Sequence, residues 1–299
     1  MSFKEGLKTI LVATDLEKRS EAALEYARKL AAAYGARIVL AHGIDPVEYA
    51  AVDAVPGRIL EGLTAQARTA LGKLSGDLLR EGIPSHSEVR QGAVIQMLLD
   101  VARQYEAGLI VVGTQGMEGA GPVIVGAIAE QLVRLAACPV LAVAADWNAG
   151  VCRPAPGGPV LLAMERNAAA AAAGAAAYSL AQTFERPLLV LHARSTAEAS
   201  AGENPCAASL EDFGLPSHDR VTVRCFVKDG DPQQVITSGI AEYHPCILVA
   251  GVKRASDAPG PHGTAFALLS SSRVPVLCVP PEEAPAGWKP EFSAVVEIT

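Results

Sequence analysis

The stretch Leu109-Ile-Val-Val-Gly-Thr-Gln-Gly116 joins an apolar, strand-like run to a glycine-rich loop. The loop continues to Gly126 and Ala127, and the helix-like segment 128–134 follows it. A strand, a glycine loop and a helix in this order are typical of a phosphate-binding turn in a parallel α/β sheet. Glycines let backbone N–H groups approach an anion, and the helix N-terminus adds positive potential. The glycine spacing alone supports a phosphate site and a plain loop equally.

Strands and helices alternate on both sides of this stretch. Apolar runs predict strands, periodic patterns predict helices, Ser20 is expected to cap a helix and Gly35 to end it. The predicted order is strand 9–14, helix 20–35, strand 37–42, helix 57–81, a weaker strand 84–90, helix 93–105, strand 109–112, helix 128–136 and strand 140–143. This alternation predicts a five-stranded parallel sheet with right-handed crossovers and helices on both faces.

The second half of the chain repeats the strands of the first half. Four pairs match in order: 160–165 with 10–15, 188–192 with 38–42, 246–251 with 108–113, and 274–279 with 138–143. The repeat predicts two tandem domains, 1–146 and 159–280, with a Gly- and Pro-rich linker 147–158 and a tail 281–299. Segment 195–217 lacks periodicity and is expected to be a loop, and 294–298 is a candidate edge strand. The fold class is therefore α/β, with two Rossmann-like or flavodoxin-like domains, each with a five-stranded parallel sheet flanked by helices.

Composition and charge favour some partners and disfavour others. The 299 residues include 25 basic and 32 acidic ones, for a net charge of −7, without a basic stripe, so nucleic acid is not expected as a partner. The start of the chain lacks an apolar signal and the six cysteines form no CxxC pair, which predicts a reducing, cytoplasmic setting with free thiols. The alanine-rich segment 168–181 is shorter than the roughly 20 residues of a spanning helix, so we expect a packed helix and no membrane.

Several motifs of the first half together resemble the universal stress protein domain. They are Ala13-Thr-Asp15, His42-Gly-Ile-Asp45, the spacing Gly113-x2-Gly116-x9-Gly126 with Ala129-Glu130 behind it, and Ala137-Cys-Pro-Val-Leu141. With the internal repeat, the chain is similar to a tandem, two-domain member of that family. The resemblance implies an adenine nucleotide alpha hydrolase-like fold and a cytoplasmic role as a stress-response regulatory protein.

The resemblance also implies a candidate ATP site in the first domain, with Mg²⁺ accompanying the nucleotide. ATP-binding members carry Ser or Thr after the last glycine, where this chain has Ala127. Losing that hydroxyl would cost roughly 0.5–1.5 kcal/mol for a neutral hydrogen bond, or about 1.5–3 for one to a charged phosphate. Glu118 in the same loop is a further feature against phosphate. The candidate residues are Thr14, Asp15, Gly43, Gly113, Gly116, Gly126, Ala127 and Ile128.

The second domain departs from the motif in another way. The equivalent candidates are Glu165, Gly251, Gly263 and Thr264, but Arg254 stands where the second glycine is expected. Because a side chain there disfavours the backbone geometry that glycine allows, this domain is predicted to be degenerate.

Three functions from different classes stay open at this stage. The first is a regulatory protein that holds ATP, the second an interaction module without a nucleotide, and the third a slow ATP hydrolase. No catalytic residue is identified, and the chain has no GxSxG or Walker sequence. His42 and His192 end matching strands without partners at metal-ligand spacing, so we expect structural, hydrogen-bonded histidines and no metal site.

The partner expected within the chain is its own second domain. The resemblance implies pairing through the last strand of each domain, 140–143 with 276–279, as an internal pseudo-dimer that leaves a homodimer open. The sequence names no other protein partner.

Overall fold

The computed structural model describes residues 3–49, 56–114, 127–145, 147, 158–165, 168–194, 221–252 and 264–281. The chain divides into an N-terminal unit, Gly6–Ala145, and a C-terminal unit, Asp146–Thr299 together with Met1–Glu5. Because 148–157 and 282–299 lie outside the described residues, the limits of the predicted linker and tail stay predictions. The same holds for the loop 195–217 and the edge strand 294–298.

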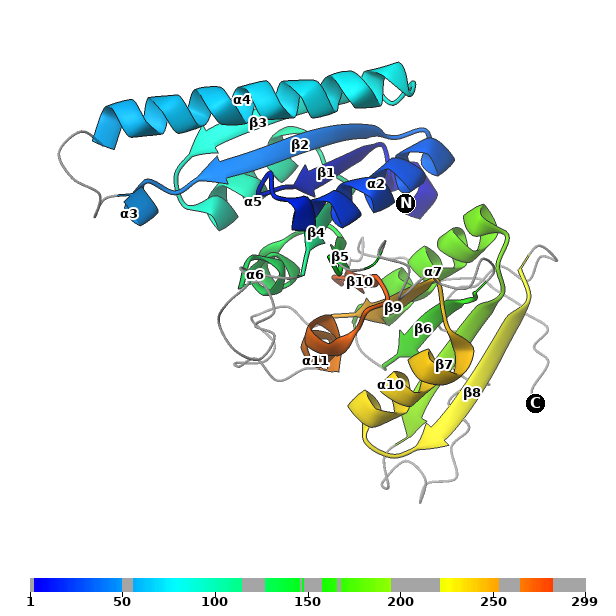
Figure 1. Cartoon of the computed structure of the whole chain (residues 1–299). Helices are drawn as coiled ribbons and strands as arrows, with labels where there is room; N and C mark the ends of the chain where they lie inside the picture. Colours follow the sequence, from blue (N-terminus) through cyan, green and yellow to red (C-terminus); the bar gives the residue numbers. More distant parts are fainter. Residues whose placement is uncertain are drawn as a thin grey trace, which may run out of the picture. The chain divides into compact units, whose positions relative to one another are not determined.

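The N-terminal unit alternates strands and helices in the predicted order (Figure 1). After α1 (Phe3–Gly6), its elements are β1 (Thr9–Ala13), the short helix η1 (Lys18–Ser20), α2 (Glu21–Tyr34), β2 (Arg37–Ile44), α3 (Pro46–Tyr49), α4 (Pro56–Arg80), β3 (Ser85–Gln91), α5 (Val94–Gln104), β4 (Leu109–Gly113), α6 (Ala127–Leu135) and β5 (Val140–Val143).

The strands of this unit form a parallel sheet in the order β3-β2-β1-β4-β5. Right-handed crossovers place α2 and α4 on one face and α5 and α6 on the other, and α5 packs against α6. The central strands β1 and β4 are buried on both faces, with Ile10, Val12, Ile110 and Val111 among their core residues. Their continuous apolar runs are what parallel strands between two helical layers require.

The C-terminal unit repeats this arrangement. Its elements are β6 (Val160–Met164), α7 (Ala170–Phe184), β7 (Leu188–Arg194), β8 (Val223–Asp229), α10 (Pro232–Tyr243), β9 (Ile247–Gly251), α11 (Thr264–Ser271) and β10 (Val276–Val279). All its strand pairs are parallel, in the order β8-β7-β6-β9-β10. The predicted α/β fold with two tandem Rossmann-like units is confirmed.

Three expectations about the helices have definite outcomes. Gly35 ends α2 with φ 68° in the left-handed region, and its N–H donates to Ala31 O, as predicted. Ser20 occupies the predicted N-cap position of α2, but its side chain accepts no hydrogen bond from the first turn of the helix. The prediction that Ser20 caps this helix was therefore wrong. The alanine-rich segment forms the packed helix α7, and no described helix is long and apolar enough to cross a membrane.

The cysteines agree with the sequence expectation in part. Cys138, Cys246 and Cys278 are free, and burial raises the pKa of the Cys278 thiol to about 12. Cys225 is disulfide-bonded, so the expectation of a free thiol was wrong there. Its partner is not among the described residues.

Candidate functional site

The strand order of the N-terminal unit reverses between β1 and β4. From β1 the chain moves to β2 on one side, and from β4 it moves to β5 on the other. The crevice outside the carboxyl ends of strands at such a point is where open α/β sheets bind ligands. Thr14 and Thr114 follow the two strands, and their N–H groups donate to Ala41 O and Val143 O, each at 3.0 Å. The predicted residues Thr14, Asp15 and Gly113 therefore lie at one edge of the sheet.

Hydrogen bonds order the turn that follows β1. Thr14 Oγ1 lies 2.8 Å from Ser20 Oγ and accepts from Leu16 N at 3.0 Å. The Asp15 carboxylate accepts from Glu17 N at 2.9 Å through Oδ1 and from Arg19 Nε at 3.1 Å through Oδ2. The Asp15 side chain is 48% exposed, and a carboxylate has about four acceptor sites. Asp15 is thus oriented by its own turn and keeps capacity to accept from a ligand hydroxyl.

Gly113 has open space where a side chain would stand. A Cβ built there would meet Arg19 O at 3.8 Å, an ordinary van der Waals distance, and no other described atom within 4 Å. Packing within the described chain therefore does not require glycine at this position. The contact with Arg19 also places the turn after β1 beside the end of β4.

Gly43, at the end of β2, has a different explanation. A Cβ there would lie 2.7 Å from Met97 Cε and 3.2 and 3.3 Å from the two Val94 methyl groups. Close packing of α5 against β2 accounts for this glycine without a ligand.

The helix that closes the glycine loop, α6, begins at Ala127, with Ile128 40% exposed. Glu130 lies in its first turn and pairs with Arg134 at 3.0 Å. Because a carboxylate there offsets part of the positive potential of the helix N-terminus, it weakens attraction for an anion. Gly116 and Gly126 lie outside the described residues, so the structure gives the loop only its two ends, Thr114 and Ala127.

The C-terminal unit brings its candidates to an equivalent edge. Glu165 directly follows β6, and Gly251 ends the neighbouring strand β9. Val252 N then donates to Val279 O at 2.9 Å, which is the counterpart of the bond from Thr114 N to Val143 O in the first unit. Thr264 begins α11, and Gly263 lies outside the described residues.

The two histidines at matching strand ends make the same contact. His42 Nδ1 donates to Thr14 O at 2.9 Å, and His192 Nδ1 donates to Met164 O at 3.1 Å. Each ring thus links β2 or β7 to the end of the central strand beside it, and the predicted hydrogen-bonded structural role is confirmed. The described residues contain no group of three or more His, Cys, Asp or Glu side chains that could hold a metal ion.

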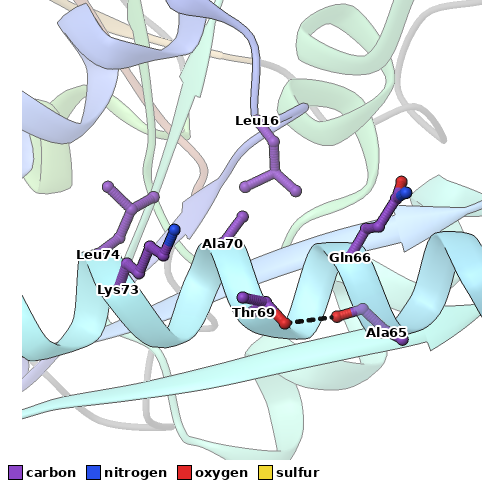
Figure 2. Close-up of a pocket in the computed structure, with 7 residues that line it drawn as sticks. All are labelled: Leu16, Ala65, Gln66, Thr69, Ala70, Lys73 and Leu74. Atoms are coloured by element: carbon purple, nitrogen blue, oxygen red, sulfur yellow. Dashed lines mark hydrogen bonds between the residues drawn. The ribbon is translucent and has the colours of Figure 1, made fainter.

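The sequence did not predict a pocket of about 570 Å³ between the turn after β1 and the flank of α4 (Figure 2). Its lining residues are Leu16, Ala65, Gln66, Thr69, Ala70, Lys73 and Leu74. Strand-end motifs carry no signal for this pocket, because all but one of these residues come from a helix. The pattern in the sequence that could have indicated the pocket is the mixture of apolar and polar residues along one side of segment 65–74.

Comparison with known proteins decides the family. A model described as the Universal stress protein family matches residues 6–144. The chain is 32% identical to Universal stress protein A homolog 1 of Coxiella burnetii over 141 residues. This aligned region covers 46% of this chain and 95% of that protein. The chain belongs to the universal stress protein family. A universal stress protein of Mycolicibacterium smegmatis is 31% identical over 189 residues, 61% of this chain and 63% of that relative's length.

Solved structures match this universal stress protein along most of its length. A universal stress protein from Archaeoglobus fulgidus superposes with a TM-score of 0.74 at 16% identity, covering 92% of this chain and 99% of that one. A functionally unknown protein from Pseudomonas aeruginosa gives 0.64 at 20% identity, covering 93% and 94%. At these identities the likeness is one of fold, and it extends over both units.

Proposed function

We propose that this universal stress protein is a regulatory protein that holds ATP at the carboxyl edge of its N-terminal sheet. The observation that carries the proposal is the open space at Gly113, a glycine that packing against the described residues does not require, beside the ordered Asp15 turn. Membership of the family supports it. The nucleotide would act by stabilising one conformation of the surrounding loops and so changing which partner binds.

The residues divide by the chemistry each offers. Asp15, as a partly exposed acceptor, suits the hydroxyl groups of ribose. The N-terminus of α6 and the glycine loop with Gly116 and Gly126 suit the phosphates. Mg²⁺ would accompany those phosphates as part of the ligand. A helix N-terminus contributes about 0.3–1 kcal/mol at an exposed site, so most of the binding must come from backbone N–H groups of the loop.

The proposal predicts that nucleotide stays with the protein through purification. Acid release followed by ion-exchange chromatography should identify ATP, close to one per chain. Asp15→Asn keeps the shape of the side chain and removes its charge, so it should retain less. Protein that is free of nucleotide and gains no thermal stability in millimolar Mg-ATP would contradict the proposal.

An interaction module without a nucleotide is the second candidate, and three observations favour it. Ala127 provides no hydroxyl, Glu130 lies in the first turn of α6, and Arg19 already pairs with Asp15. Under this candidate, protein partners would bind with equal affinity in the presence and absence of ATP. Slow ATP hydrolysis stays a third prediction, which phosphate release abolished by Asp15→Asn would support.

A further inference from the structure

We propose that the pocket between Leu16 and α4 is a second ligand site, which takes an aliphatic chain with one anionic head group. The pocket is an open groove with a volume of about 570 Å³: Ala65, Gln66, Thr69 and Lys73 of its lining are exposed and its other three lining residues are half-buried, so a ligand would lie along it partly covered. Apart from Leu16, every lining residue belongs to α4. The pocket therefore differs from the crevice between β1 and β4, whose described candidates Thr14, Asp15 and Gly113 are not among its lining residues.

The walls of the pocket favour an aliphatic ligand. Leu16, Ala70 and Leu74 provide aliphatic surface, and Figure 2 shows Ala70 and Leu74 rising from α4 toward the turn that carries Leu16. The hydroxyl of Thr69 donates to Ala65 O at 2.9 Å, so its hydrogen is used within the helix. Among the described residues that line the pocket, none is aromatic and could stack on a base, which favours a flexible alkyl chain over a nucleobase.

A cation at the pocket favours a negative head group. Lys73 lines the pocket, and Figure 2 shows its ammonium directed over the helix toward the space below Leu16. Within the described part of the chain, no carboxylate forms an ion pair with Lys73, whereas Arg80 of the same helix pairs with Asp77. An ammonium without a carboxylate partner beside an aliphatic surface complements a carboxylate on an alkyl chain.

The surrounding structure holds the pocket in shape. Just after the C-terminal end of α4, Arg28 Nη1 of α2 donates to Glu81 Oε1 at 2.8 Å, which links α2 to the residue that follows α4. At the pocket, Leu16 adopts φ 65°, which is disfavoured for leucine, and its N–H is held by Thr14 Oγ1. This local strain is of the kind found at ligand sites, and it sets the position of the pocket's upper wall.

The test uses the full chain, stripped of nucleotide, and titrates it calorimetrically with octanoate, decanoate and dodecanoate below their micelle concentrations. We expect one saturable site whose affinity rises about twofold per added methylene, as half-covered hydrocarbon requires. Absence of saturable heat, or affinity independent of chain length, would overturn the proposal. Because ATP is not present, failure here leaves the proposed nucleotide function untouched.

Two variants locate the site. Ala70→Trp fills the pocket and should abolish decanoate binding, while unchanged binding would overturn the proposed location. Lys73→Gln should weaken decanoate about threefold, within the range of an exposed charge pair, and leave neutral decanol unaffected. Lys29→Gln, the same change on α2 outside the pocket lining, is the control. Equal losses for decanoate and decanol in Lys73→Gln would show that Lys73 does not bind the head group.

Discussion

At the scale of single residues, two glycines that the family motif treats alike have different reasons to be glycine. The Cβ position of Gly43 is crowded by Met97 and Val94 of α5, whereas the space at Gly113 is open within the described chain. The sequence placed both glycines at strand ends, because an apolar run that stops at a polar residue or a glycine can be recognised from the sequence. It could not tell which one faces a neighbouring helix, since that depends on the distance between β2 and α5.

This difference predicts that the same substitution destabilises the fold at Gly43 and has little effect on stability at Gly113. Gly43→Ala should lower the free energy of unfolding by about 1 kcal/mol, because Met97 must move and Val94 is crowded. Gly113→Ala should leave stability within about 0.5 kcal/mol of the parent, as for a change away from strained or crowded sites. Urea denaturation measures both, and an equal loss in the two variants would contradict the packing account.

Glu88 on β3 predicts a dependence of stability on pH. Burial opposes its ionisation, but the hydrogen bond from Tyr105, 2.6 Å long, and the nearby Arg90 outweigh burial and hold the pKa of Glu88 below its ordinary 4.5. A carboxyl with a lowered pKa stabilises the fold above its unfolded pKa, and this contribution disappears as pH falls through the folded pKa.

Glu88→Gln should therefore reduce the free energy of unfolding at pH 7 and make little difference well below pH 4.5. Urea denaturation at pH 7 and at pH 3 compares the two proteins. Tyr105→Phe, which keeps the ring and removes the donor, should reproduce part of the effect. A Glu88→Gln penalty that is the same at both values of pH would exclude the carboxylate charge as its source.

At the scale of elements, each unit brings the starts of its two central strands close together at a glycine. In the N-terminal unit, a Cβ on Gly108, just before β4, would lie 2.2 Å from Gly6 O. In the C-terminal unit, a Cβ on Gly158, before β6, would lie 2.3 Å from His244 O. The glycine precedes β4 in the N-terminal unit, but in the C-terminal unit it precedes β6, the counterpart of β1. Comparing equivalent strands in the sequence does not reveal that the two glycines serve the same close approach.

Gly108→Ala should cost about 1–3 kcal/mol of stability, because backbone rather than a flexible side chain must move. Gly62→Ala is the matched control. It lies within α4 with open space around its Cβ position and should raise stability by about 0.5–1 kcal/mol. Thermal unfolding distinguishes the two, and a stable Gly108→Ala variant would contradict the close approach.

The elements that the sequence predicted well are those buried on both faces. Strands β1, β4 and β6 have uninterrupted apolar runs, which only a strand between two helical layers needs. The edge strand β3 gave a weak signal, and in the second domain neither the fifth strand of the predicted sheet, β8, nor helix α10 was assigned to residues. Edge strands mix polar and apolar residues because they are partly open to solvent, as the exposed Arg224 and Asp229 are in β8.

At the scale of the whole molecule, the chain carries two copies of one fold with different site residues. The copies share strand order and the histidine contact. They differ at the strand end, where Asp15 of the first copy corresponds to Glu165 of the second. The sequence predicted this organisation because the strands of the first half recur in the same order in the second half. It could not predict the pocket on α4, because the pocket depends on how the turn after β1 lies beside the helix.

The central claim, that the N-terminal unit holds ATP beside Gly113, is tested most directly by calorimetric titration of nucleotide-free protein with Mg-ATP. We expect one-to-one binding, weakened at least tenfold in Gly113→Val and retained in Gly62→Ala, with both variants folded by circular dichroism. No binding heat from the parent protein, or unchanged affinity in Gly113→Val, would contradict the claim and favour the interaction module.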